Sequence, residues 1–198
     1  MPKVVNRAEK QQAILDSAVD VIYEQGIEAV SIRQIARASG MGRSSIYTYF
    51  NNREDILHVA LRQVLAAFEK LQSDLLAQTW SVTDKISGFF RDSFYPDEKL
   101  SRYVVVVTEY LAYLRRHRRQ ADALVSDFTL RLKALFESLL KQGISQGEFI
   151  PHDTEKMAVI LSALNEHQIL HKIYTANNTV PFDHTSVRLI LQGILKRM

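Results

Sequence analysis

Residues 31–53 read SIRQIARASGMGRSSIYTYFNNR. Ser31 is suited to cap one short helix, and a second short helix is predicted over residues 43–50. Ala36 is small enough to let the two helices pack closely, and Gly40 can adopt the positive φ that a tight turn between them requires. Two short helices joined by such a turn form a helix-turn-helix, and three apolar residues are spaced to fill its core: Ile35, Met41 and Ile46.

The same stretch is strongly basic. It contains four arginines (Arg33, Arg37, Arg43 and Arg53) and no acidic residue, so it carries +4, whereas the whole chain carries only +3. The remaining residues therefore sum to −1. Three further basic residues lie nearer the N-terminus: Lys3, Arg7 and Lys10. A basic excess confined to a helix-turn-helix predicts that this part of the chain lies against the phosphates of a DNA duplex.

The composition is typical of a globular protein, because 46% of the 198 residues are apolar and 24% are charged. Cysteine is absent, which excludes a disulfide framework, a cysteine-ligated metal and a thiol nucleophile. The apolar runs are far shorter than the ~20 residues that span a bilayer. The N-terminus lacks the apolar core of a secretory signal. We therefore expect a cytoplasmic protein that uses neither a cofactor nor a metal.

Outside the helix-turn-helix, apolar residues also recur at helical spacing. A long helix is expected after residue 53, because it would carry one sustained apolar stripe: Leu57, Leu61, Val64, Phe68, Leu71 and Leu75. A later helix is expected from Ser81 or Thr83 to Tyr95. The run Val104–Val107 favours a strand by propensity, but the chain offers no partner strand, so we interpret it as a buried helical turn.

The chain is thus predicted to be all-α, with about nine helices in total. We expect an N-terminal three-helix DNA-binding domain over residues 1–54, with the helix-turn-helix motif at about 32–51. A larger C-terminal helical bundle is expected over residues 55–198. An enzyme is not expected, since the sequence has no Gly-rich phosphate loop, no Gly-x-Ser-x-Gly elbow and no Asp/His pair at a catalytic spacing.

Across residues 10–60 the sequence resembles the TetR family of bacterial transcriptional regulators. The resemblance rests on the first helix from Ile14 to Gly26 and on Ser31-Ile32, Ile35-Ala36, Gly40, Ile46-Tyr47, Phe50, Arg53 and Leu57. The chain departs from the family pattern with Ser39 for Ala, Gly42 for a Ser cap, Ser44 for Gly, Tyr49 for His and Arg53 for Lys. Glycine is an acceptable N-cap, so the fold is preserved. The changes at 42 and 44 bear on which operator sequence is bound.

The resemblance implies a homodimer whose paired recognition helices enter successive major grooves of a palindromic double-stranded DNA operator. The C-terminal part would pair through its last two helices and hold a pocket for a small-molecule effector. Effector binding would change the separation of the two DNA-binding domains and release the operator, as in a ligand-responsive repressor. Two other classes stay open: a DNA-binding regulator or architectural factor without an effector, and a small helical enzyme or metal-binding protein.

Eight residues are predicted to contact DNA: Arg33, Arg43, Ser44, Ser45, Tyr47, Thr48, Tyr49 and Arg53. Residues at the start of a recognition helix reach base edges, so Arg43 is the candidate for a contact with guanine. Tyr47 and Tyr49 could donate hydrogen bonds to phosphates, although Tyr49 alternatively packs in the domain core. Arg33 is assigned to the DNA backbone. The resemblance implies the same for Arg53, which matches a phosphate-contacting Lys of the family. For Arg33 and Arg53 alike, an ordinary surface charge is the alternative.

An effector pocket in a helical bundle is lined by apolar and aromatic groups with a few polar ones. On that basis the candidate pocket residues are Phe90, Tyr103, Glu109, Tyr110, Phe128, Asn165 and Gln168. Aromatic residues at helical spacing more often form the hydrophobic core, so a core role is the alternative for each of them. A buried Glu109 would suit a cationic ligand.

Two further polar clusters are interpreted as ordinary surface features and not as functional sites. The run Arg115–Arg119 is interpreted as a solvated connection between helices, with a second nucleic-acid surface as the alternative. His167 and His171 are four residues apart and follow Glu166, a spacing that can bind a metal. We nevertheless expect an ordinary surface or interface pair, and no metal site.

Overall fold

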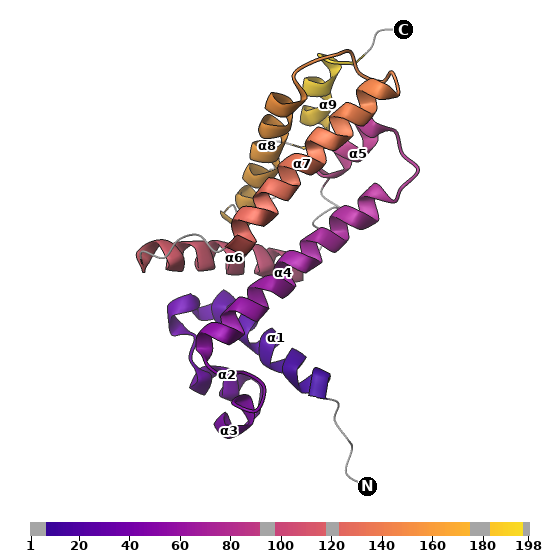
Figure 1. Cartoon of the computed structure of the whole chain (residues 1–198). Coiled ribbons are helices and arrows are strands. Elements are labelled where there is room, and N and C mark those ends of the chain that lie inside the picture. Colours follow the sequence, from indigo (N-terminus) through magenta and orange to yellow (C-terminus); the bar gives the residue numbers. More distant parts are fainter. Residues whose placement is uncertain (1–6, 92–97, 118–122, 175–182, 196–198) are drawn as a thin grey trace. The chain divides into compact units, whose positions relative to one another are not determined.

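The computed structural model describes residues 7–91, 98–117, 123–174 and 183–195 (Figure 1). Within these residues it has nine α-helices, one short 3-10 helix and no β-structure beyond a single bridge between Phe149 and Leu195. The all-α prediction is therefore confirmed, and Val104–Val107 lie inside a helix. The elements are α1 (Arg7–Gln25), η1 (Ile27–Ala29), α2 (Ile32–Ala38), α3 (Arg43–Ile46), α4 (Arg53–Leu76), α5 (Val82–Gly88), α6 (Glu98–Arg116), α7 (Ala123–Ser145), α8 (Thr154–Tyr174) and α9 (His184–Gln192).

Helix α2 begins and ends for the reasons that its sequence predicts. The Ser31 hydroxyl oxygen accepts from the Gln34 amide at 3.2 Å, which satisfies one of the free N–H groups at the helix start. Two amides close its other end on carbonyl oxygens: Gly40 on Arg37 at 3.4 Å, and Met41 on Ala36 at 3.0 Å. This Schellman pattern requires a left-handed residue, and Gly40 supplies it with a φ of +67°.

Helix α3 is shorter than predicted. The sequence predicts a helix over residues 43–50, whereas regular α-helix runs only from Arg43 to Ile46. The next amides, those of Thr48 and Tyr49, donate to carbonyls three residues back at 3.2 and 2.9 Å, so the chain winds more tightly here. The buried side chain of Phe50 ends this turn.

Helix α5 also ends earlier than predicted, at Gly88 rather than at Tyr95. Ser81 caps its start, with its hydroxyl oxygen accepting from the Asp84 amide at 3.0 Å. After Gly88, the amides of Phe89 and Phe90 donate to carbonyls three residues back, at 3.2 and 3.0 Å, which ends the regular helix. Tyr95 itself lies outside the described residues.

The chain divides into two compact units. Unit 1 comprises Met1–Ala67 and Arg102–Ala121, and unit 2 comprises Phe68–Ser101 and Asp122–Met198. Unit 1 therefore holds α1 to α3, the first part of α4 and most of α6 (Figure 1). It is larger than the domain predicted over 1–54, because α4 extends it and α6 returns to it from later in the chain. The functional boundary between residues 54 and 55 stays a prediction.

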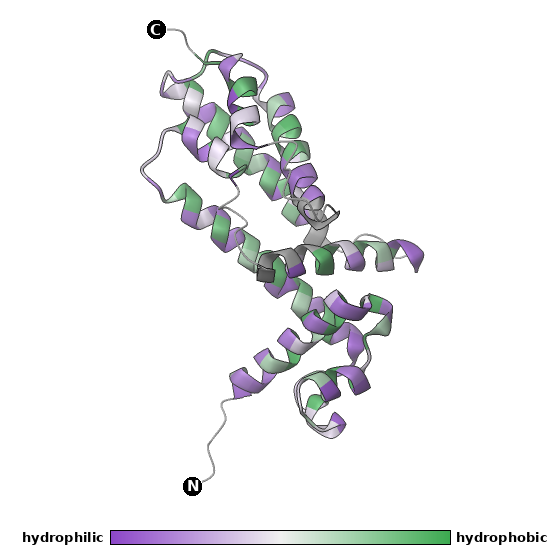
Figure 2. Cartoon of the chain, turned by 180° about the vertical axis from the view of Figure 1, so that it is seen from behind, coloured by the Kyte–Doolittle hydropathy of each residue, from purple (hydrophilic) through white to green (hydrophobic). Residues whose placement is uncertain are grey.

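Hydrophobic and hydrophilic residues alternate around the helices of both units, so each helix can bury one side (Figure 2). In unit 1 the predicted core residues Ile35 and Ile46 are completely buried, and Met41 is half-buried. None of the described helices is both long enough and apolar enough to cross a bilayer.

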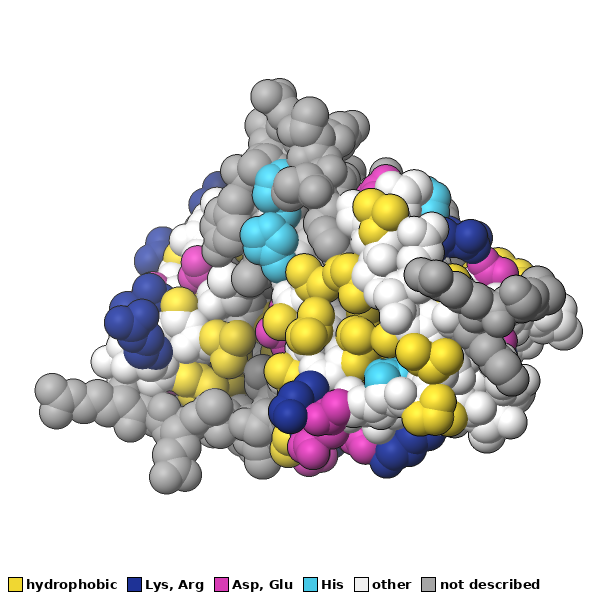
Figure 3. Space-filling view, turned by 90° about the horizontal axis from the view of Figure 1, so that it is seen from above, with side chains coloured by type: hydrophobic (Ala, Val, Ile, Leu, Met, Phe, Trp, Pro, Cys, Tyr) yellow, Lys and Arg dark blue, Asp and Glu magenta, His cyan; other side chains and the backbone are white. Residues whose placement is uncertain are grey.

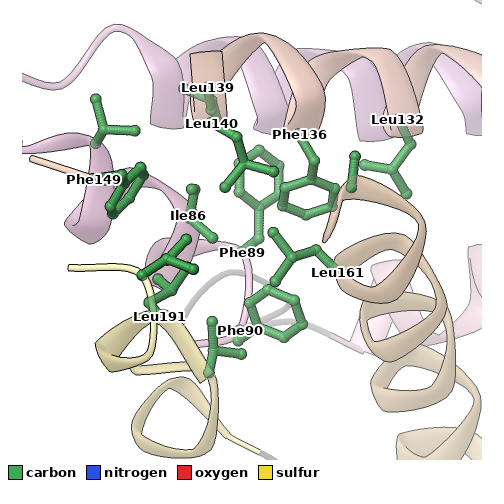
Figure 4. Close-up of a cluster of buried hydrophobic side chains, with 14 of the residues drawn as sticks. Ile86, Phe89, Phe90, Leu132, Phe136, Leu139, Leu140, Phe149, Leu161 and Leu191 are labelled. Carbon is green, nitrogen blue, oxygen red and sulfur yellow. The ribbon is translucent and has the colours of Figure 1, made fainter. Parts of the chain in front are cut away.

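The core of unit 2 is centred on aromatic side chains (Figure 4). Phe136 of α7 packs edge-on against Phe89, with ring centroids 5.0 Å apart, and stacks on Phe90 at 6.2 Å. All three side chains are completely buried, and Leu161 of α8 and Leu191 of α9 join the cluster. Unit 2 is thus held together by residues from α5, α7, α8 and α9.

The turn after α7 fixes the start of α5. Gly143 lies so close to Phe149 that a Cβ added there would be 2.3 Å from the ring. The carboxylate of Glu148 accepts from the amides of Val82 and Thr83 at 2.8 and 3.0 Å. Amides at the start of a helix have no acceptor within the helix, so Glu148 satisfies them. The helix dipole also favours a negative charge at this end.

Candidate nucleic-acid interface

The start of α3 presents the residues predicted to contact bases. Ile46 is completely buried and anchors the helix, while Arg43, Ser44 and Ser45 are exposed. Tyr47 is 57% exposed, and Thr48 is exposed as well. Side chains at the start of a recognition helix are those that reach base edges in the major groove.

Three exposed arginines of the helix-turn-helix have no side-chain partner among the described residues. Arg33, Arg37 and Arg43 are exposed, and none of them forms an ion pair or hydrogen bond with another side chain in the part of the chain that the structure describes. Exposed guanidinium groups on a segment without acidic residues create a positive potential that attracts a polyanion. The charge pattern of the sequence therefore corresponds to a real surface of unit 1.

Tyr49 is predicted either to bond to a phosphate or to pack in the domain core, and its surroundings have features of both. It is half-buried, and the guanidinium of Arg7 lies over its ring, 5.8 Å from the centroid. Arg7 is the first residue of α1, so this contact brings a basic side chain from the N-terminal part of the chain to the end of the helix-turn-helix. The sequence identifies Arg7 as basic, but no spacing rule connects it with Tyr49.

Arg53 differs from the other arginines of this stretch. It begins α4, and its side chain is only 19% exposed. Its guanidinium donates to the carbonyl oxygens of Val30 and Ile27, both at 2.6 Å. The Tyr113 hydroxyl lies 3.4 Å from Nη1, and the Tyr113 ring lies 5.2 Å from the guanidinium carbon. The phosphate contact implied for Arg53 stays a prediction, but this guanidinium already has partners within unit 1.

The seven predicted pocket residues do not fall in one unit. Tyr103, Glu109 and Tyr110 belong to unit 1, whereas Phe90, Phe128, Asn165 and Gln168 belong to unit 2. The Glu109 carboxylate accepts from the Ile27 amide at 3.3 Å, so it serves η1. A role for these residues in ligand binding stays a prediction.

Asn165 and Gln168 are the buried polar residues of unit 2 that sequence reasoning selected. They are 1% and 0% exposed. Asn165 Nδ2 donates to the Phe89 carbonyl at 3.1 Å, and Gln168 Nε2 donates to the Phe90 carbonyl at 3.0 Å. Both side chains therefore hold the end of α5, where the backbone has left the regular helix.

The two remaining polar clusters lie on separate elements. Arg115 and Arg116 end α6 and are exposed, and residues 118–122 lie outside the description. On α8 the rings of His167 and His171 are 6.0 Å apart, and partial burial raises the pKa of the neighbouring Glu166 carboxyl. In the described residues, no group of three or more His, Asp or Glu side chains is arranged to hold a metal.

Comparison with known proteins identifies the N-terminal part of the chain. Residues 14–60 match the family model described as bacterial regulatory proteins, tetR family. The chain is 29% identical over 125 residues to the HTH-type transcriptional regulator BetI of Rhizobium meliloti, an alignment that spans 62% of this chain and 59% of BetI. It is 24% identical over 148 residues to the HTH-type transcriptional repressor KstR2 of Mycolicibacterium smegmatis, spanning 73% of this chain and 69% of KstR2.

The fold has similar solved structures along its whole length. A putative transcriptional regulator from Saccharomonospora viridis, solved in complex with choline, superposes with a TM-score of 0.80. The superposition covers 96% of this chain and all of that one at 20% sequence identity, so it supports the fold alone. The matched family model, the curated relatives and this shared helical architecture agree with the helix-turn-helix described above, and residues 14–60 are a DNA-binding segment of the tetR family of bacterial regulatory proteins.

Proposed function

We propose that the protein is a ligand-responsive transcriptional repressor, which binds a palindromic DNA operator as a homodimer and is released by a small-molecule effector. The observation that carries the proposal is the exposed, acid-free start of α3, which is anchored by the buried Ile46. There Arg43 forms no ion pair or side-chain hydrogen bond with any residue that the structure describes. KstR2, a relative named as a repressor, supports repression. The choline complex of the structural neighbour supports an effector.

Contacts with bases would provide sequence preference, and contacts with phosphates would provide affinity. Arg43 can direct two parallel N–H groups at the acceptors of a guanine, which is worth about 1–3 kcal/mol of discrimination. Arg33 and Arg37 on α2 would neutralise phosphates, which adds affinity without sequence preference. Ser44, Ser45, Tyr47 and Thr48 can add hydrogen bonds to bases or phosphates on the same exposed stretch.

A second copy of the chain would cover the exposed apolar residues of α8 and α9. Val159 and Ile160 are 50% and 47% exposed, and Leu189 is 68% exposed. Figure 3 displays one face of the molecule, on which hydrophobic side chains gather centrally with histidines and charged side chains around them. Apolar patches with a polar rim are typical of protein interfaces, and two-fold pairing is the commonest way to bury them.

A buried polar group in unit 2 suggests what the effector offers. Gln168 Oε1 is completely buried and has no hydrogen-bond partner among the residues that the structure describes. A buried acceptor without a donor costs about 1–3 kcal/mol. An effector with a hydroxyl or ammonium group could satisfy it by donating a hydrogen bond. We therefore expect an effector that combines an apolar body with a hydrogen-bond donor.

The proposal is tested by selecting bound sequences from a pool of random duplexes with the full chain. A palindromic site should be enriched, and Arg43→Ala should weaken binding to that site about five- to 150-fold while relaxing the preference at one base pair of each half-site. Lys141→Ala removes the same charge from α7, where Lys141 pairs with Glu137, and should leave affinity unchanged. Absence of any enriched site, or equal effects of the two variants, would contradict the proposal.

A further inference from the structure

The backbone N–H and C=O groups of Ile27 both bond to side chains of later helices. Ile27 opens η1, the short segment between α1 and α2. Its carbonyl oxygen accepts from Arg53 Nη2 at 2.6 Å, and its amide donates to the Glu109 carboxylate at 3.3 Å. Arg53 Nε reaches the carbonyl of Val30, also at 2.6 Å. One guanidinium thus spans η1 from its first residue to the residue before the Ser31 cap of α2.

Helix α6 completes this arrangement. Tyr113 is 6% exposed, and its hydroxyl and ring both contact the Arg53 guanidinium. At the end of the same helix, Arg116 and His117 approach the Glu28 carboxylate, at 3.2 and 3.4 Å. The contacts of Glu28 join η1 to α6, and the contact between Arg53 and Tyr113 joins the arginine that binds η1 to the same helix. We call the set Arg53, Glu109 and Tyr113 the η1 clamp.

We propose that Arg53 is a positioning residue for DNA binding rather than a phosphate contact, and that the η1 clamp holds α2 and α3 at the orientation in which α3 meets DNA. This inference rests on the proposed DNA-binding function. The direction in which the chain enters α2 is determined by residues 27–30, and Arg53 bonds to both ends of that segment. Its planar guanidinium donates in two directions while one face lies on Tyr113.

A lysine cannot replace this arginine. Its ammonium is a compact point charge without the planar fork, so it cannot donate to both carbonyls and lie flat on a tyrosine ring. A phosphate contact, by contrast, needs only a positive charge and is well served by lysine. Arg53→Lys therefore separates the two roles, because it keeps the charge and removes the clamp geometry.

The experiment uses the full chain, the operator selected as above, and two readouts. The first is operator affinity as a function of salt, and the second is hydrogen exchange of the amides of residues 27–34, which needs no DNA. We expect both Arg53→Lys and Arg53→Ala to weaken binding about ten- to hundredfold. Both should speed exchange of these amides, and Arg53→Lys should leave the slope of log affinity against log salt as in the wild type. Tyr113→Phe, which keeps the ring, should have a smaller effect in the same direction.

One control variant separates a specific effect on η1 from a general loss of stability. Ile14→Val removes one methyl group from the core of unit 1 and reports what a general loss of stability does to DNA binding. If Arg53→Lys binds like the wild type and Arg53→Ala lowers the salt slope by about one, Arg53 is a phosphate contact and the inference is wrong. Unchanged exchange at residues 27–34 in both variants also overturns it. If the wild type selects no duplex, the proposed function fails, and exchange alone decides whether Arg53 holds η1.

Discussion

The helix-turn-helix of unit 1 and the bundle of unit 2 bury apolar cores alike but use their polar side chains in opposite ways. In the helix-turn-helix, Arg33, Arg37 and Arg43 are exposed and have no side-chain partner within the described ranges. In the bundle, Asn165 and Gln168 point inward and hold backbone carbonyls. Unpartnered charges on the surface are suited to a polyanion outside the protein, whereas buried amides stabilise the protein itself or meet a ligand inside it.

The difference teaches where a substitution should affect binding and where it should affect folding. Exposed arginines without partners contribute little to stability, because they lose no contact when they are replaced. Buried residues of unit 2 contribute packing and hydrogen bonds that the solvent cannot replace. The following predictions test each side of this division.

The largest effect is expected in the aromatic core of unit 2. Phe136→Ala should lower the free energy of unfolding by about 3–5 kcal/mol, because it removes a completely buried ring that contacts Phe89 and Phe90. Urea denaturation followed by circular dichroism measures the loss. Leu130→Ala is the control on the same helix, since Leu130 is 64% exposed, and it should change stability by no more than about 0.5 kcal/mol. Similar losses for both would mean that the core is not where it is described.

The next effect concerns the apolar residues that a second copy would cover. Leu189→Glu should weaken the dimer at least about 30-fold, because it buries an unpaired carboxylate in each subunit. Sedimentation velocity over a range of concentrations measures the dimer. Leu130→Glu places the same charge on an equally exposed leucine of α7 and should leave the dimer intact. If Leu130→Glu alone dissociates it, the interface lies on α7 instead.

Much of the helix-turn-helix could be predicted because its determinants are local. The Ser31 cap, the Gly40 turn and the buried Ile35 and Ile46 all involve residues a few positions apart. The length of α3 could not be predicted, because the switch to bonds three residues back after Ile46 is a small adjustment in which residue propensities do not differ. The exposure of Arg43 could be predicted, because the buried Ile46 fixes which side of the same helix faces the core.

The role of Arg53 and the grouping of the pocket candidates could not be predicted for the opposite reason. The partners of Arg53 lie 23, 26 and 60 residues away in the chain. Helical spacing tells which side of a helix is apolar, but not which neighbour that side meets. Glu109 and Gln168 both appear as polar residues on apolar helices, yet Glu109 bonds to η1 in unit 1, and Gln168 bonds to the backbone just after α5 in unit 2.

A smaller effect is expected for the buried amides. Asn165→Ala should lower the free energy of unfolding by about 1–3 kcal/mol, because it removes the donor to the buried Phe89 carbonyl. Gln168→Met should cost less, since it loses one hydrogen bond but also removes the acceptor Oε1, for which the described part of the chain offers no partner. Chemical denaturation of the two variants in parallel measures the difference. A greater loss for Gln168→Met would argue that Oε1 is satisfied in solution, and would weaken the case for an effector contact there.

The smallest effect involves a charge that stabilises a helix start in unit 2. Asp183 caps α9 by accepting from the amides of Thr185 and Ser186, both at 3.0 Å. The hydrogen bond from the Thr185 hydroxyl contributes most to lowering the Asp183 pKa to about 2, and bonds from Ser186 and the Thr185 amide add to it. The ionised form is therefore favoured in the folded protein. It contributes at most about 2 kcal/mol, a contribution that is complete above the unfolded pKa near 4 and is lost as the pH falls towards 2.

Asp183→Asn isolates this contribution, because asparagine is also a good N-cap but does not titrate. At pH 6 the variant should be less stable than the wild type by about 1 kcal/mol, and the gap should close between about pH 4 and pH 2. Urea denaturation at several pH values measures the gap, and the carboxyl chemical shift of Asp183 followed by NMR gives its pKa directly. A gap that persists below pH 2, or an Asp183 that titrates near 4, would mean that the cap acts through its shape and not through its charge. In that case the charge of Asp183 would add nothing to stability, whereas the charge of Arg43 would still serve to attract DNA.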